Sequence, residues 1–177
     1  MPEKFLKKVC LLGDGAVGKT SLVRRFVSDQ FEDKYILTVG TKVVKCDIKV
    51  SISGAEATVT LMIWDILGQR MHDSLHAAYY SGASGALIVC DITRRETFDH
   101  VPEWIEAFRK SSPKSCVLLL ANKSDLPSWG ATKDELDELA RKYDANGYLT
   151  SAKTGQKVEQ AFGEIALKMC TEASKPE

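Results

Sequence analysis

The sequence lacks an excess of charge of either sign, and it lacks an apolar run long enough to span a bilayer. Lysine and arginine together number 24, as do aspartate and glutamate, so the formal net charge is zero. This balance argues against a general binder of nucleic acids or of anionic membranes. The apolar runs ALIVCDI and CVLLLAN are far shorter than the ~20 residues that a membrane-spanning helix needs. We therefore expect a soluble protein that has no nucleic acid as a partner.

Paired cysteines, a secretory leader and a lipidation signal are also missing. The five cysteines are scattered without a Cys-x-x-Cys pair, and three of them lie inside or beside apolar runs. This spacing favours reduced, packed thiols in a cytosolic protein over a zinc site or a disulfide framework. The chain starts with Met-Pro, without the glycine that myristoylation requires, and its last cysteine is Cys170. We expect a cytoplasmic protein without a membrane anchor in this chain, attached peripherally to a membrane only if a longer form carries a lipidated tail.

What the sequence does contain is an alternation of short apolar runs with longer amphipathic stretches. Six runs predict strands: Phe5–Leu12, Thr41–Ser51, Ala57–Ile66, Gly85–Asp91, Cys116–Ala121 and Gly147–Thr150. Gly54, between the second and third runs, suits a hairpin turn. Apolar residues recur at helical spacing from Val101 and from Val158, which predicts a helix at each place. TKDE at Thr132–Glu135 is a capping box that opens another predicted helix. The alternation predicts an α/β protein, a three-layer α/β/α sandwich with a six-stranded, mostly parallel sheet and one antiparallel hairpin strand.

The segment GDGAVGKT directly follows the first apolar run. It matches the phosphate-binding P-loop pattern Gly-x-x-x-x-Gly-Lys-Thr, with a predicted strand before it and a helix after it. Glycines let backbone N–H groups surround phosphate oxygens, and the positive end of the helix dipole faces the same oxygens. We expect Lys19 to reach the β- and γ-phosphates and the Thr20 hydroxyl to bind Mg²⁺. The predicted phosphate cradle consists of Gly13, Asp14, Gly15, Ala16, Val17, Gly18, Lys19, Thr20 and Ser21.

A second motif, ANKSD, lies at the end of the fifth predicted strand. Here the sequence resembles the small GTPases, whose guanine signature Asn-Lys-x-Asp is present as Asn122, Lys123 and Asp125. The carboxylate of Asp125 can accept two hydrogen bonds, from N1–H and the exocyclic amine of guanine, whereas adenine presents no donors there. The segment SAK after the last strand matches the second guanine loop of the family. It implies contacts to the base from Ser151, Ala152 and Lys153.

The resemblance also assigns residues to the two switch segments of these GTPases. WDILGQ, at the end of the third predicted strand, has the Asp-x-x-Gly-Gln pattern of switch II. Asp65 would hold Mg²⁺ through a water molecule, the Gly68 N–H would contact the γ-phosphate, and Gln69 would orient the attacking water. Thr38 has the spacing of the switch I threonine that closes over Mg²⁺. Phe31 has the spacing of the aromatic residue beside the guanine ring, although it could equally belong to the core.

The resemblance extends from Lys4 to about Met169 and is strongest to the Rab branch, although the P-loop looks more like that of the Rho branch. It implies one G domain over residues 1–177, with a core at about 4–170, that binds GTP or GDP with Mg²⁺. It also implies slow hydrolysis of GTP by a monomeric molecular switch. The implied catalytic residues are Lys19, Thr38, Gly68 and Gln69, and the implied metal ligands are Thr20, Thr38 and Asp65. Effectors, an exchange factor and an activating protein would read the surface at roughly Phe31–Lys45 and Leu67–Tyr80.

Two departures from the family pattern concern hydrolysis. The family has Thr-Ala between the aspartate and glycine of switch II, where this chain has Ile66 and Leu67. A leucine close to Mg²⁺ and the γ-phosphate would hinder the closing of switch II. The predicted switch I segment EDKYILTVG contains no arginine, so it lacks a built-in arginine finger. A GTP-binding scaffold with negligible hydrolysis is therefore a second hypothesis, while the guanine signature disfavours an ATP-dependent kinase.

Histidine and tryptophan contribute four further expectations. His72 and His76 are four residues apart, a spacing that could bind zinc on a helix. No third ligand is evident, so we expect both to be exposed surface residues of switch II. Helical spacing places Trp104 in the core, and Trp129 is expected in a loop.

Overall fold

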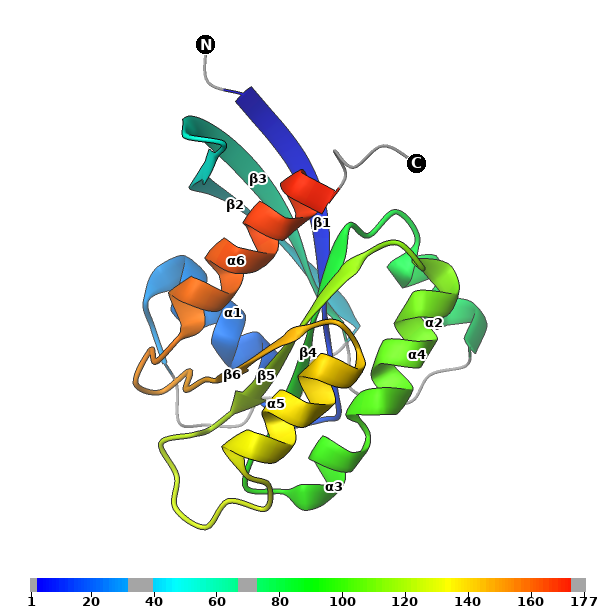
Figure 1. The fold of residues 1–177 in the computed structure, drawn as a ribbon, viewed down its shortest axis with the longest axis vertical. Helices are drawn as coiled ribbons and strands as arrows, with labels where there is room; N and C mark the ends of the chain where they lie inside the picture. Colours follow the sequence, from blue (N-terminus) through cyan, green and yellow to red (C-terminus); the bar gives the residue numbers. More distant parts are fainter. Residues whose placement is uncertain (1–2, 32–39, 67–72, 173–177) are drawn as a thin grey trace.

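In the computed structural model, which describes residues 3–31, 40–66 and 73–172 (the side chains of 73–75 excepted), six strands form one sheet (Figure 1). Their order across the sheet is β2-β3-β1-β4-β5-β6. The strands are β1 (Glu3–Leu12), β2 (Thr41–Ile52), β3 (Ala55–Ile66), β4 (Gly85–Asp91), β5 (Cys116–Asn122) and β6 (Asn146–Leu149). The β2–β3 pair is antiparallel and the other four pairs are parallel. The predicted sheet with a single antiparallel strand is confirmed.

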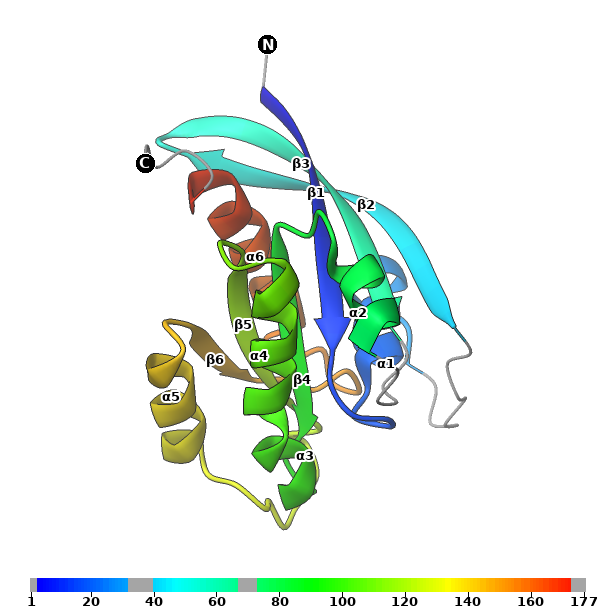
Figure 2. The same cartoon turned by 90° about the vertical axis from the view of Figure 1, so that its right-hand side faces the viewer.

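Helices cover both faces of this sheet (Figures 1 and 2). They are α1 (Lys19–Ser28), α2 (Asp73–Tyr80), α3 (Arg95–Asp99), α4 (Val101–Ser111), α5 (Lys133–Lys142) and α6 (Val158–Thr171). Side chains alternate along a strand, so Val9 and Leu11 of β1 pack into a core with α1 and α6, while Cys10 and Leu12 pack into a second core with α2 to α5. The predicted three-layer α/β/α sandwich is confirmed.

The predicted strand ends differ from the observed ones by no more than two residues. The β2–β3 turn consists of Ser53 and Gly54, whose φ angles are 51° and 85°, and it places Ile52 opposite Ala55. Two residues with positive φ form the turn whose twist matches that of the flanking strands. β1 and β3 each begin two residues before the predicted start, because backbone pairing continues into exposed segments that have no apolar pattern.

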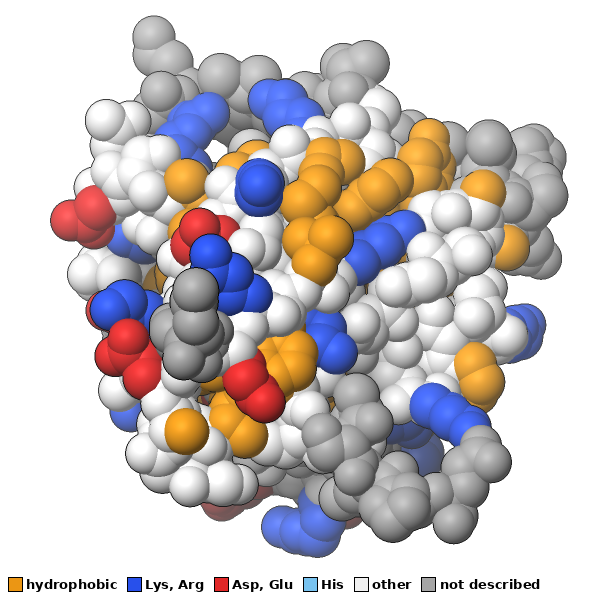
Figure 3. Space-filling view, turned by 90° about the horizontal axis from the view of Figure 1, so that it is seen from above, with side chains coloured by type: hydrophobic (Ala, Val, Ile, Leu, Met, Phe, Trp, Pro, Cys, Tyr) orange, Lys and Arg blue, Asp and Glu red, His pale blue; other side chains and the backbone are white. Residues whose placement is uncertain are grey.

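The carboxyl ends of the five parallel strands lie at one edge of the sheet. The loops that follow β1, β3, β4, β5 and β6 therefore meet there, as expected for the ligand-binding edge of such a sheet. At the opposite end of the molecule, apolar side chains lie on the surface, with individual lysine and arginine side chains beside them (Figure 3). No helix in the described ranges is long and apolar enough to cross a bilayer.

The prediction that His76 is exposed is wrong. His76 is only 8% exposed, and its ring lies 5.5 Å from that of Tyr80 and 5.9 Å from that of Trp104. Residues four apart on a helix share a face, and this face of α2 packs against α4. His72 lies outside the described residues, and the described part of the chain holds no group of three or more His, Cys, Asp and Glu side chains that could bind a metal ion.

The expectations for Trp104 and Trp129 are confirmed. Trp104 is 6% exposed, and Trp129 is 42% exposed in the loop after β5. All five cysteines lie in the described ranges, where no disulfide joins them, and Cys46 alone among them is more than slightly exposed. Burial raises the pKa of Cys10 and Cys90 to about 12, so these thiols stay protonated at neutral pH.

Candidate nucleotide-binding site

Two glycines of the P-loop are required by the fold itself. Gly13 has φ 143°, and a Cβ there would lie 2.0 Å from the carbonyl oxygen of Val89. Gly18 has φ 102°, and a Cβ there would lie 2.3 Å from Nδ2 of Asn122. Gly15 differs, because a Cβ at this position would have no described neighbour within 4 Å. The backbone thus approaches the strand ends closely at both ends of the loop and leaves open space beside Gly15.

Lys19, the first residue of α1, places a buried ammonium group inside the P-loop. Its side chain donates to the carbonyl oxygens of Gly13 and Asp14, at 2.8 and 2.7 Å. Lys19 is 7% exposed, and this burial lowers its pKa from 10.5 to about 8, although the charges of Asp65 and Asp14 act in the opposite direction. A buried amine with neutral carbonyl neighbours is a position where an anionic ligand gains strong electrostatic stabilisation.

The next three carbonyl groups of the P-loop accept hydrogen bonds from side chains of other loops. The carbonyl of Gly15 accepts from Arg94 at 2.9 Å. The carbonyl of Ala16 accepts from Lys123 at 2.8 Å, and that of Val17 accepts from Asn122 at 2.9 Å. In a trans peptide, the C=O and the following N–H point in opposite directions. Successive N–H groups are therefore directed to the other side of the loop, in the arrangement that binds phosphate oxygens.

Thr20 and Asp65 form a donor set that fits Mg²⁺. The Thr20 hydroxyl donates to Oδ2 of Asp65 at 2.5 Å. Asp65 is 2% exposed, and its other oxygen, Oδ1, is buried without a hydrogen-bond partner among the described residues. Burial raises the pKa of Asp65, while the Thr20 hydrogen bond and the charge of Lys19 act to lower it. A hydroxyl beside an unsatisfied carboxylate oxygen suits a hard cation that prefers oxygen ligands.

Asn122 joins three loops of the site. It is 1% exposed, and besides its bond to the P-loop, its side-chain oxygen accepts from the backbone N–H of Ala152 and the hydroxyl of Thr150, both at 3.3 Å. Ser151 donates to the carboxylate of Asp125 at 2.6 Å, and Asp125 itself is exposed. The two predicted guanine motifs therefore lie side by side, and Asp125 is exposed between them and solvent.

Several residues that hold this arrangement have no motif in the sequence. Arg25 of α1 donates to the carbonyls of Ala152 and Lys153, at 2.7 and 2.6 Å. Asp14, predicted only as part of the cradle, directs its carboxylate to the start of α4 and the residue before it. There it accepts from Nε1 of Trp104 at 2.8 Å and lies 2.6 Å from Nδ1 of His100. These contacts join residues more than eighty positions apart in the sequence, so no local sequence pattern predicts them.

The structure says less about the roles of the other predicted site residues. Ser21 lies in the first turn of α1. Phe31 is partly buried against the core that contains α1 and α6, so its predicted position beside the base stays a prediction. Thr38, Gly68 and Gln69 lie outside the described residues, and so does Leu67.

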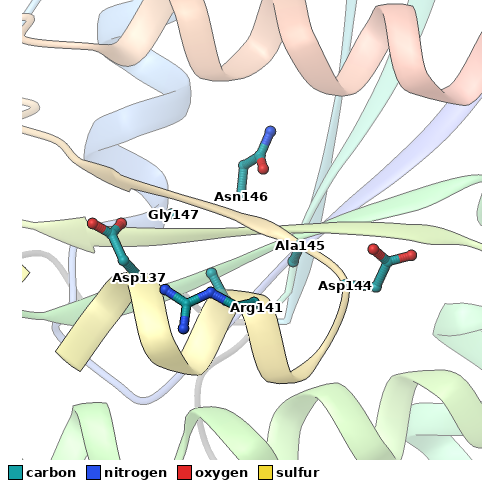
Figure 4. A pocket seen from close by; sticks show the side chains of 7 residues that line it. Asp137, Arg141, Asp144, Ala145, Asn146 and Gly147 are labelled. Carbon is teal, nitrogen blue, oxygen red and sulfur yellow. The ribbon is translucent and has the colours of Figure 1, made fainter. Parts of the chain in front are cut away.

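A pocket elsewhere on the molecule contains none of the predicted site residues. It lies between α5 and the beginning of β6 and is lined by polar groups such as Asp137, Arg141 and Asn146 (Figure 4). β6 is parallel to β5, so its beginning faces the edge of the sheet opposite the P-loop. The candidate site is the P-loop and its neighbouring loops.

Known proteins are similar to this chain in sequence. The sequence model of the Ras family matches residues 8–171. The Ras-related protein RABA4b of Arabidopsis thaliana is 35% identical to this chain over 173 residues, which cover 97% of this chain and 75% of that protein.

Proposed function

The chain belongs to the Ras family, as a Rab-like GTP-binding protein, and we propose that it hydrolyses GTP and acts as a nucleotide-dependent switch. The proposal includes the individual roles of the site residues. It also includes one G domain over residues 1–177 that works as a monomer.

The observation that carries the proposal is the direct bonding between the P-loop and the guanine signature. A P-loop alone suits many nucleoside triphosphates, and a polar loop after a strand alone indicates no ligand. Here the side chains of Asn122 and Lys123 donate to the carbonyls of Val17 and Ala16. These bonds support the proposal because they would hold the phosphate site and the base site in a fixed relative position, as one ligand with both groups requires.

The phosphate end of the ligand would be bound by backbone and cation together. The N–H groups that follow Gly15, Ala16 and Val17 would donate to phosphate oxygens, and Lys19 would exchange its carbonyl partners for the β- and γ-phosphates. Thr20 and Asp65 would hold Mg²⁺, directly and through water. When bound, Mg²⁺ supplies positive charge against the β- and γ-phosphates.

The base and the attacking water would be handled by separate residues. Asp125, positioned by Ser151, would accept the two donors of guanine. Gln69 would orient the water for attack on the γ-phosphorus, while Thr38 and the Gly68 N–H would bring switch I and switch II to Mg²⁺ and the γ-phosphate. Loss of the γ-phosphate would release both segments.

The proposed partners follow from this switch. Effectors, an exchange factor and an activating protein would contact roughly Phe31–Lys45 and Leu67–Tyr80, because these segments change with the nucleotide. We place the protein in the cytoplasm, with peripheral membrane association if a lipidated tail is part of a longer chain.

Single-turnover hydrolysis tests the enzymatic part of the proposal. Protein loaded with GTP and Mg²⁺ should release phosphate on the order of 10⁻⁴ to 10⁻³ s⁻¹, the intrinsic rate of Ras. Hydrogen exchange measured in parallel should differ between the GDP complex and a non-hydrolysable GTP complex in the two switch segments. Tight GTP binding with no phosphate release and identical exchange would instead identify a GTP-binding scaffold.

A further inference from the structure

Arg94 lies in the loop between β4 and α3 and reaches the P-loop from outside the predicted motifs. Its Nη2 donates to the carbonyl of Gly15 at 2.9 Å, and its Nε lies 3.2 Å from Oδ2 of Asp91. Its side chain is 38% exposed. A guanidinium group can make both contacts at once because its donors diverge in fixed directions, which a lysine ammonium cannot reproduce.

Asp91 anchors this bridge. Its side chain is 3% exposed, and its Oδ1 accepts from the backbone and the hydroxyl of Thr93, at 3.0 and 2.6 Å. Its Oδ2 also lies 2.7 Å from Nζ of Lys123. Burial acts to raise the pKa of Asp91, but the hydrogen bonds from Lys123 and Thr93 outweigh it and keep the pKa below its ordinary value. One ionised carboxylate thus holds two cations, Arg94 and Lys123.

The two cations bind consecutive carbonyls of the P-loop. Arg94 binds that of Gly15, and Lys123 binds that of Ala16. The Gly15–Ala16 peptide is the more easily rotated of these, because glycine has wide backbone freedom and a Cβ at Gly15 would touch no described atom. Rotation of this peptide would turn its carbonyl oxygen toward the phosphates and its N–H away from them. The bond from Arg94 opposes that rotation.

The two P-loop carbonyls directly before that of Gly15 are also bound by a cation. Lys19 donates to the carbonyls of Gly13 and Asp14. The carbonyls of residues 13 to 16 therefore each accept a hydrogen bond from a cationic side chain, and Arg94 provides the one at Gly15.

We propose that Arg94 is a positioning residue of the nucleotide site: through Asp91 and the Gly15 carbonyl it keeps the Ala16 N–H directed at the phosphates, and it favours the triphosphate over the diphosphate. This inference rests on the proposed binding of guanine nucleotides. The inference goes beyond that function because Arg94 lies outside the P-loop, outside the guanine motifs and outside the predicted switch segments.

The test compares Arg94→Gln and Arg94→Lys with the neighbouring control Arg95→Gln. Arg95 pairs with Asp99 and Glu135, at 2.9 and 2.7 Å, and these contacts lie on α3 and α5. For each variant, dissociation constants are measured for Mg²⁺-GDP and for a Mg²⁺-bound non-hydrolysable GTP analogue. The ³¹P resonances of the bound analogue and the thermal unfolding midpoint are recorded as well.

Arg94→Gln should weaken the triphosphate about tenfold and the diphosphate less than about threefold, as expected for loss of one charge-assisted contact. The β- and γ-phosphate resonances should shift, because the Ala16 N–H is no longer held. Arg94→Lys should recover only part of the lost affinity, since it restores the charge without the bridge. Arg95→Gln should leave both affinities and the resonances unchanged.

Equal weakening of both nucleotides with unchanged ³¹P resonances would reduce Arg94 to a structural ion pair and overturn the proposal. Full recovery by Arg94→Lys would overturn the bridging role. If Arg94→Gln does not fold, the ratio of triphosphate to diphosphate affinity in Arg94→Lys decides, and an unchanged ratio overturns the proposal. A wild-type protein that binds neither nucleotide would instead refute the proposed function itself, and the inference would fall with it.

Discussion

The buried amine of Lys19 should make nucleotide binding take up a proton near pH 8. Lys19 is 7% exposed, and burial lowers its pKa to about 8. Phosphate groups placed beside the amine would return its pKa to 10.5 or above, because an adjacent negative charge favours the ammonium form. Binding is therefore coupled to protonation of this one group.

The size of the effect follows from the two pKa values. The free protein would hold the Lys19 proton in about 0.8 of molecules at pH 7.5 and in about 0.2 at pH 8.5, whereas nearly every complex would hold it. Binding should then take up about 0.2 proton at pH 7.5 and about 0.8 at pH 8.5, and the affinity should fall about threefold over this interval.

The same shift affects the nucleotide-free protein in a definite direction. The lowered pKa means that the unfolded chain binds more protons than the folded one between pH 8 and 10.5, so stability rises with pH in that window. Below pH 8 the charged, buried amine costs about 3 kcal/mol, which is relieved as the pH rises.

Calorimetry in two buffers of different ionisation enthalpy measures the proton uptake at each pH. Lys19→Arg is the control, because its guanidinium stays protonated throughout and protons exchanged by the nucleotide itself are common to both proteins. Equal uptake at pH 7.5 and 8.5 in the wild type would refute the reasoning. An uptake in Lys19→Arg that matches the wild type at pH 8.5 would refute the assignment to this side chain.

Three further predictions address the base, the metal and the water. Asp125→Asn should shift the preference from guanine toward xanthine by reversing one hydrogen bond, and competition binding with xanthosine diphosphate checks this. Thr20→Asn should weaken Mg²⁺-GTP more than Mg²⁺-GDP, as titrations with both nucleotides would show, and equal losses would argue against its metal role. Gln69→Leu should remove most of the hydrolysis, whereas Leu67→Ala should raise the single-turnover rate if Leu67 crowds switch II; no change in the latter would mean that this departure is harmless.

Much of the fold could be predicted because the central strands carry an unambiguous signal. All seven residues of β4 and of β5 are buried, and this produces continuous apolar runs with clear ends. The beginnings of β1 and β3 are harder to see in the sequence. Their first residues continue the backbone pairing, but the side chains there are polar or exposed. His76 was misplaced because a polar side chain at a helix–helix contact has no apolar pattern to reveal it.

The site divides in a similar way. Residues expected to contact the ligand, such as Lys19 and Asp125, could be proposed from the sequence because they belong to short motifs with fixed spacing. The residues that hold those motifs in place could not, because Arg25, Asp91 and Arg94 act on loops that are distant in sequence. Their roles depend on which loops the sheet order brings together, and that order emerges only in the folded chain.

The affinity of the wild-type protein for GTP against ATP, each with Mg²⁺, tests the central claim most directly. GTP should bind more tightly by a factor of about 10⁴, because adenine would leave the Asp125 carboxylate without its two donors. Comparable affinities for the two nucleotides would contradict the account.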